Sequence, residues 1–286
     1  MSKIYQINNK LLKVDNVPVI RPTHFIRVRT NADNTPPIGS YDYAIQRDTR
    51  IYDVYKESDD WSYLFYNDHK NNPTVVEVIY WDISGVTTLD TAFCDCGNLT
   101  SVAYTDLSTV TNLHATFCRC GSLTSIPLFN TKNVTTMAYF LDATALTEIP
   151  FFDTHNVVYM NNAFSGTRIT SAHEYDLSSA TMVQGLFHSC SNLTDVPDYD
   201  IPLATNSEYM FWGCTSLTDI PDLNIPNVLY CTRMFIYCYN VETGMLRIYN
   251  KLKNTAGYYH SECFRDCGIN TTAGSAELAQ IPDDWK

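Results

Sequence analysis

A phenylalanine recurs along this chain at a nearly constant interval, and this repeat limits the possible folds more than any other feature of the sequence. The recurring residues are Phe93, Phe117, Phe140, Phe164, Phe187, Phe211, Phe235 and Phe264, with spacings of 24, 23, 24, 23, 24, 24 and 29 residues. A period in this range is typical of proteins built from stacked repeats. The sequence therefore predicts eight stacked rungs.

Each rung carries a short pattern after its phenylalanine. In six rungs a cysteine stands three residues later, while Ala143 and Thr167 stand there in the other two. Leu-Thr-x-Ile/Val follows, often ending in proline. We interpret these cysteines as buried and unreactive, because free cysteine packs as a small hydrophobe. A zinc site at the Cys94/Cys96 and Cys118/Cys120 pairs is one alternative, and disulfides are the other.

The Leu-Thr-x-Ile/Val run favours a short strand, and its proline ends that strand because proline cannot donate to a ladder. We therefore expect an α/β solenoid, a leucine-rich-repeat-like array of about eight 23–24-residue rungs with a parallel sheet and a helical turn on the return leg. One buried column should hold the repeated leucines, which are Leu99, Leu123, Leu146, Leu193 and Leu217.

The chain divides into four predicted parts. Residues 82–240 form the repeat array, residues 23–81 a β-rich unit that caps it, and residues 241–286 a C-terminal cap with a helix over 242–252. Residues 1–22 are predicted to be a docking arm, and an alternative makes them the first strand of the next unit. The β-prone arm residues are Ile4, Tyr5, Ile7, Leu11, Leu12 and Val14.

The composition excludes several classes of partner. The net charge is −12, and residues 82–240 hold fifteen acidic groups against four basic ones. Nucleic acids and anionic membrane surfaces both require a positive patch, so neither is an expected partner. We recognise no export signal and no apolar stretch of about 20 residues, so synthesis in a cytoplasm without membrane insertion is expected.

The sequence holds no recognisable catalytic motif. Gly-x-Gly-x-x-Gly, the P-loop, Gly-x-Ser-x-Gly and His-Glu-x-x-His are all missing, so we expect no enzyme, no cofactor and no metal site. Glu148, Asp195 and Asp219 share the position before Ile or Val on their rungs. They form a candidate acidic strip for a cation or a basic partner, and a solvated surface is the alternative.

The segments 117–137 and 140–160 carry a family resemblance. Phe-x-x-Cys-x-x-Leu-Thr-x-Ile-Pro, followed by Phe-Asn-Thr-Lys-Asn-Val-Thr-Thr-Met, resembles the BspA-like surface leucine-rich repeat over roughly residues 82–240. The end of the chain, residues 276–286, is similar to the C-terminal cap of such proteins in gut Bacteroidetes and their phages. The resemblance implies a non-enzymatic surface or adhesion role.

Two functions follow from this resemblance. The first is a bacteriophage virion protein, a fibre or appendage made in the host cytoplasm, which docks on other virion proteins through its arm and forms a homo-oligomer. Its repeats would face outward and bind a host surface protein or glycan. The second is a bacterial cell-surface adhesin. A surface-glycan enzyme is a remote third, because a fold does not by itself imply an activity.

Overall fold

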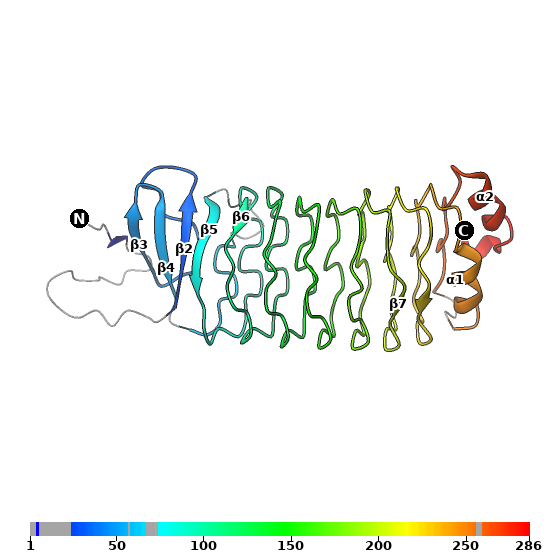
Figure 1. Ribbon diagram of the computed structural model, residues 1–286, viewed down its shortest axis with the longest axis horizontal. Helices are drawn as coiled ribbons and strands as arrows, with labels where there is room; N and C mark the ends of the chain where they lie inside the picture. The colour runs from blue at the N-terminus through cyan, green and yellow to red at the C-terminus, as the bar shows by residue number, and fades with distance from the viewer. Residues whose placement is uncertain (1–3, 6–23, 57, 67–71, 73, 256–258) are drawn as a thin grey trace.

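The protein is an elongated stack with a β-sheet at one end and two short helices at the other (Figure 1). This computed structural model describes residues 4–5, 24–56, 58–66, 72, 74–255 and 259–286. Between the two ends the chain runs through successive turns that lie side by side along the long axis (Figure 1).

A six-stranded sheet occupies the N-terminal end. Its strands are β1 (Ile4–Tyr5), β2 (Phe25–Thr30), β3 (Tyr43–Asp48), β4 (Ile51–Tyr55), β5 (Val75–Asp82) and β6 (Ser101–Val102), in the order β1-β3-β4-β2-β5-β6. The pairs up to β5 are antiparallel, whereas β5 and β6 are parallel, with Val78 opposite Val102. The parallel pair connects the sheet to the stacked turns, because β6 belongs to the first of these turns.

The segment between β4 and β5 packs against the first turn. Trp61, Leu64 and Phe65 are fully buried. The Phe65 amide donates to the Ala92 carbonyl at 2.7 Å, and the Phe65 ring lies 5.3 Å from the Phe93 ring. The sheet unit and the repeats therefore share one hydrophobic core.

The prediction of an α/β solenoid with a parallel sheet is wrong. In the described residues after β6, the only strands are β7 (Tyr199–Asp200) and β8 (Leu223–Asn224), which form a two-stranded sheet, and no helix lies on a return leg. Apart from β6, these two strands and single bridges, turns and coil make up residues 83–244, which we call the coil stack. Prolines end the extended backbone after several of the Leu-Thr-x-Ile/Val runs, and left-handed residues two positions before and after each anchor phenylalanine or leucine interrupt it on the other leg of the turn.

Single parallel bridges hold the coil stack together instead of a sheet. Thr88 pairs with Asn112, Asn112 with Thr136, and Thr136 with Tyr159, so the partners lie 24 or 23 residues apart. The described leucines of the predicted column, Leu99, Leu123, Leu146, Leu193 and Leu217, are fully buried. The period read from the sequence therefore matches the spacing of the bridges, although no continuous sheet forms.

One buried residue in each turn, which we call the anchor, has its backbone amide hydrogen-bonded to the next turn. The anchors differ at one position from the phenylalanine pattern. The amide of each anchor donates to the carbonyl just before the next anchor: Phe93 to Thr116, Phe117 to Phe140, and Leu141 to Ala163. Leu141 is thus the third anchor of the array, and Phe140 is its buried neighbour. The anchors of the array are Phe93, Phe117, Leu141, Phe164, Phe187, Phe211, Phe235 and Phe264.

Left-handed residues confirm this register. Each anchor has a positive φ two residues before it and two residues after it; for Leu141 these residues are Tyr139 and Ala143, with φ of 56° and 55°. The position three residues after Leu141 therefore belongs to buried Thr144, and not to Ala143. Thr144 and Thr167 replace cysteine in the two turns that are one residue short, and their hydroxyls donate to the carbonyls of Leu141 and Phe164.

The C-terminal end contains α1 (Met245–Leu252), α2 (Thr272–Leu278) and a short 3₁₀ helix, η1 (Asp283–Trp285). The helix predicted over 242–252 is therefore present, and it begins after Gly244, whose φ is 100°. The amide of the last anchor, Phe264, donates to the carbonyl of Trp285 at 2.9 Å. The Trp285 ring also stacks on His260 at 4.2 Å, so this tail covers the last turn.

Candidate binding surface

The three predicted acidic residues are exposed, but they do not form one cluster. Ser171 occupies the turn between Glu148 and Asp195, and its bridge pairs it with Asp195. Asp219 accepts a hydrogen bond from Thr243 and lies 3.8 Å from the Arg247 guanidinium. Part of the predicted strip is therefore neutralised by the protein itself.

A row of exposed apolar side chains begins at positions three residues further along the turns than this strip. It consists of Tyr80, Tyr104, Leu128 and Phe151, which are 47%, 61%, 57% and 57% exposed. The four belong to successive turns: the β5–β6 register carries Tyr80 onto Tyr104, and the next two follow at 24 and 23 residues. We call this row the apolar ladder.

Local backbone geometry explains why these side chains point outward. Each ladder position stands directly before a buried one, and successive side chains of an extended chain face opposite sides. The buried residues that follow successive ladder positions are Trp81, Thr105, Phe129, Phe152, Tyr175, Tyr199 and Leu223. The register is therefore fixed from inside the core, by contacts such as that between Trp81 and Phe129, whose rings lie 5.8 Å apart.

The ladder position changes from apolar to acidic along the stack. After Phe151 it is occupied by Glu174, Asp198 and Asp222. Asp222 forms an ion pair with Lys251 of α1. Among the described residues, no cation lies within ion-pair distance of Glu174 or Asp198, although the Asp198 carboxylate accepts the Asp222 amide at 2.6 Å. Apolar side chains and unneutralised carboxylates thus share one row.

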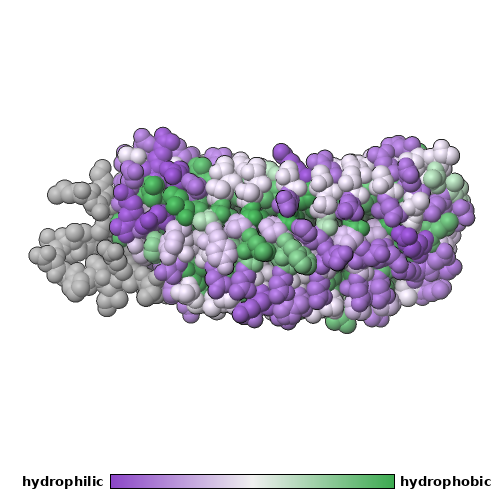
Figure 2. Space-filling model, viewed as in Figure 1, coloured by the Kyte–Doolittle hydropathy of each residue, from purple (hydrophilic) through white to green (hydrophobic). Residues whose placement is uncertain are grey.

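Figure 2 shows that apolar surface is exposed among hydrophilic residues along the length of the molecule in that view. A large exposed apolar side chain is common when it stands alone, whereas a contiguous row is typical of an interaction site. The apolar ladder is such a row, because its members stand on adjacent turns about 4.8 Å apart.

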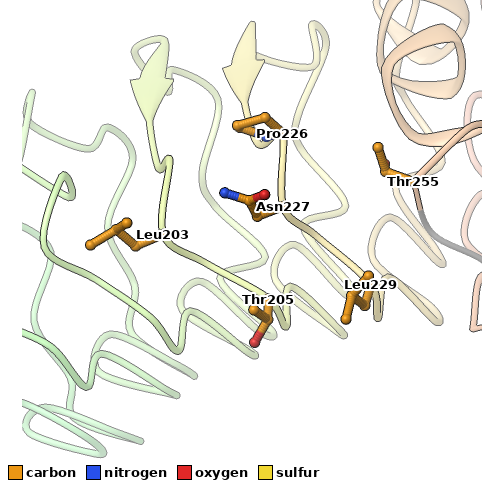
Figure 3. A pocket seen from close by; sticks show the side chains of 6 residues that line it. All are labelled: Leu203, Thr205, Pro226, Asn227, Leu229 and Thr255. Carbon is orange, nitrogen blue, oxygen red and sulfur yellow. The ribbon is translucent and has the colours of Figure 1, made fainter.

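A shallow apolar depression lies elsewhere, near the C-terminal end (Figure 3). It is lined by Leu203, Thr205, Pro226, Asn227, Leu229 and Thr255, which come from neighbouring turns and from the segment after α1. The Asn227 amide already donates to the Pro202 carbonyl at 2.7 Å. The lining holds no charged group, so it offers little to orient a ligand.

The profile of one protein family matches most of the coil stack. This family, described as "Mycoplasma protein of unknown function, DUF285", matches residues 59–171 and, in a second overlapping match, residues 140–247. The two matches together cover more than half of the chain. The chain belongs to the DUF285 family. Among curated proteins and among solved structures, the comparisons found no match.

The apolar ladder lies within the DUF285 region. Tyr80 to Phe151 fall inside the first match, and Glu174, Asp198 and Asp222 fall inside the second. That two matches overlap with an offset agrees with a family of repeated units, so this DUF285 chain is a repeat protein. The more specific likeness to BspA-like proteins and to phage proteins stays a prediction.

The cysteine column of this DUF285 chain is buried, as predicted. The Cys120 thiol donates to the carbonyl of the preceding anchor, Phe93, at 3.1 Å, and Cys190 does the same to Phe164 at 3.2 Å. Burial raises the pKa of Cys190 to about 11, and burial also raises the pKa of Cys120. These thiols therefore serve packing and backbone hydrogen bonding, since a nucleophilic cysteine needs a lowered pKa.

Cys94 and Cys118 stand outside this column and form a small cluster of their own. The guanidinium of Arg119 lies 3.4 Å from the Cys94 sulfur and 3.5 Å from the Cys118 sulfur. Two effects raise the pKa of Cys118: a hydrogen bond with Cys94, which is the larger effect, and burial. No group of three or more His, Cys, Asp or Glu side chains in the described residues is arranged to hold a metal ion.

Of the predicted docking arm, the structure describes Ile4 and Tyr5. The backbone of Ile4 and Tyr5 forms β1, which pairs with Ile45 and Ala44 at the edge of the sheet. Ile7, Leu11, Leu12 and Val14 lie outside the described residues. None of the helices in the described part of the chain has both the length and the apolar composition needed to cross a membrane.

The sequence reasoning missed the apolar ladder. The sequence does show where these residues stand: Leu128 and Phe151 directly follow Pro127 and Pro150, the prolines that end the predicted strands. A large apolar residue after such a proline would have been assigned to the core. Only the register of the buried neighbours, Phe129 and Phe152, shows that these side chains face solvent.

Proposed function

We propose that this chain is a non-enzymatic binding protein that uses the apolar ladder to contact its ligand. The observation that carries the proposal is the exposure of Tyr80, Tyr104, Leu128 and Phe151 on four successive turns. Because these four large apolar side chains are about half exposed, leaving them in water forgoes burial free energy of roughly 1 kcal/mol for each one. A ligand that covers the row recovers this free energy.

The proposed location is a bacteriophage virion, in which the chain forms a homo-oligomeric fibre or appendage. The resemblance of the repeats and of the C-terminal segment supports this location, and the bacterial cell surface is the second candidate. The elongated shape suits either role, since it separates the sheet end from the C-terminal end (Figure 1). The arm at residues 1–22 is the proposed contact to other virion proteins.

Fractionation of a culture that produces the chain tests the location. An antibody against the purified protein is used on density-purified phage particles, on cell envelopes and on the soluble fraction. Enrichment in particles supports the virion role, and enrichment in envelopes replaces it with the adhesin role. Recovery only from the soluble fraction contradicts both.

A binding assay tests the role of the ladder. The purified chain and its Leu128→Ser/Phe151→Ser variant are each applied to cells of the host strain. We expect the variant to lose about ten-fold or more in affinity, because central apolar contacts dominate most interfaces. A matched control, Leu203→Ser, removes an equally exposed leucine elsewhere and should bind as the wild type does. Equal binding by all three proteins would contradict the proposal.

A further inference from the structure

The geometry of the ladder points to one class of ligand: we infer that it binds a polypeptide segment with apolar side chains at one end and basic side chains at the other. The inference rests on the proposed binding function and specifies its partner. It follows from what flanks the ladder, from the acidic continuation of the row and from the length of the row.

The ladder has an apolar flank on one side and an acidic flank on the other, where the exposed residues Asp106 and Asp153 stand two residues after Tyr104 and Phe151. Ala103, Pro127 and Pro150 come directly before the three ladder residues of the coil stack, and none has a polar side-chain group. A sugar needs hydrogen-bonding groups beside its stacking surface, because its hydroxyl groups lose water on binding. An apolar side chain of a peptide has no such need, so the apolar flank favours a peptide, and the carboxylates of the acidic flank suit its basic side chains.

The acidic continuation of the row favours basic side chains at one end of the ligand. Glu174 and Asp198 occupy the next two ladder positions, and both are exposed. In the part of the chain that the structure describes, neither has a cationic partner, in contrast to Asp222, which pairs with Lys251. Lysine or arginine side chains of a ligand would complement these two carboxylates and fix its direction along the row.

The length of the row sets the length of the segment. From Tyr80 to Asp198 there are five steps between turns, or about 24 Å at about 4.8 Å a step. An extended chain rises about 3.3 Å per residue, so a segment of about seven residues covers the row. The row lies across the turns, so the ligand contacts side chains and needs no free sheet edge.

Fluorescence anisotropy with labelled peptides tests this inference on the full chain. The probes are Val-Tyr-Leu-Val-Lys-Arg-Lys, the same peptide in reverse order, and Val-Tyr-Leu-Val-Glu-Asp-Glu; labelled cellohexaose is the sugar probe. We expect one of the two basic peptides to bind at least about ten-fold more tightly than the acidic one, with an affinity that falls as salt rises.

Two variants locate the contacts. The Leu128→Ser/Phe151→Ser variant should bind the basic peptide about ten-fold or more less tightly than the wild type does. The Glu174→Gln/Asp198→Asn variant should bind this peptide about three- to ten-fold less tightly, and its affinity should depend less on salt. The asparagine keeps an acceptor for the Asp222 amide, so the fold is not disturbed. Leu203→Ser is the matched control for both, and all variants are checked for an unchanged thermal transition.

Each other outcome has a distinct meaning. If basic and acidic peptides bind equally, or if the acidic variant binds like the wild type, the inference is overturned while the ladder remains a binding site. If cellohexaose binds through the ladder and the peptides do not, the ligand is a glycan and only the inference fails. If the Leu128→Ser/Phe151→Ser variant binds peptides, sugar and host cells as the wild type does, the inference and the proposed function fail together.

Discussion

Arg119 shows how one side chain joins neighbouring turns of the coil stack. Its Nε and Nη2 atoms donate to the two carboxylate oxygens of Asp95 at 2.5 and 2.7 Å. The Asp95 side chain is 9% exposed and that of Arg119 is 43% exposed, so the pair is only partly screened by water. The hydrogen bond from Arg119 to Asp95 raises the pKa of the guanidinium, against the effect of burial.

We expect Arg119→Ala to lower the free energy of unfolding by about 1–2 kcal/mol, because Asp95 then loses its bidentate partner in a partly buried position. The value is below that of a fully buried pair because the arginine is half-exposed. Urea unfolding at pH 7 measures the change. Arg168→Ala, at an exposed arginine, is the control and should change stability by less than about 0.5 kcal/mol.

At the scale of one turn, the register of the anchors decides which leucines stabilise the fold. Leu141 is fully buried in the anchor column, whereas Leu128 is 57% exposed on the ladder. Both are leucines of adjacent turns, and composition alone cannot tell them apart. The anchor hydrogen bond from Leu141 to Ala163, at 2.9 Å, assigns Leu141 to the core.

Leu141→Ala should therefore lower the free energy of unfolding by about 2–5 kcal/mol, through lost burial and a cavity. Leu128→Ala should change it by less than about 0.5 kcal/mol. Chemical denaturation of both variants checks the register. A small loss for Leu141→Ala would mean that Phe140 is the anchor after all, and a large loss for Leu128→Ala would mean that the ladder position is not exposed.

The left-handed positions offer a second measure of the register. Ala143 has a φ of 55°, a conformation that costs a residue with a Cβ about 1–2 kcal/mol, whereas the next turn has glycine there, at Gly166. Ala143→Gly should stabilise the protein by up to about 1 kcal/mol, once the larger entropy of the unfolded glycine is subtracted. A rise in the thermal midpoint supports this, and a clear fall would contradict it.

These turns also show what the sequence could and could not predict. The period, the buried leucines and the buried cysteines follow from hydrophobic residues that recur every 23 or 24 positions, and the structure confirms them. The continuous sheet was wrong because neighbouring turns meet mostly through single bridges. In the anchor leg, left-handed residues such as Thr91 and Asp95 interrupt the extended backbone, and because they are mostly not glycine they carry no sequence signal. The apolar ladder was missed because hydrophobicity alone does not show which side of the backbone a side chain occupies.

At the scale of the whole molecule, one hydrophobic core runs from Ile26 in the sheet to Trp285 in the tail. The cysteine column lies within it, and burial raises the pKa of Cys96, Cys120, Cys190 and Cys214. Ionisation of these thiols is therefore linked to unfolding of the core. Because the folded pKa lies above the unfolded value of about 8.5, the protonated thiol stabilises the fold below that pH.

This stabilisation should decrease as the pH rises from about 8.5 towards the folded pKa, which for Cys190 is about 11. Unfolded thiols ionise in this range while folded ones do not, so each such thiol lowers the free energy of unfolding by about 1.4 kcal/mol per pH unit. Urea unfolding under reducing conditions at about pH 7.5, 8.5 and 9.5 measures the decline. Cys190→Ala is less stable at neutral pH, but its decline should be less steep than that of the wild type. A stability that is constant or rising over this range would show that the thiols are not protonated in the core.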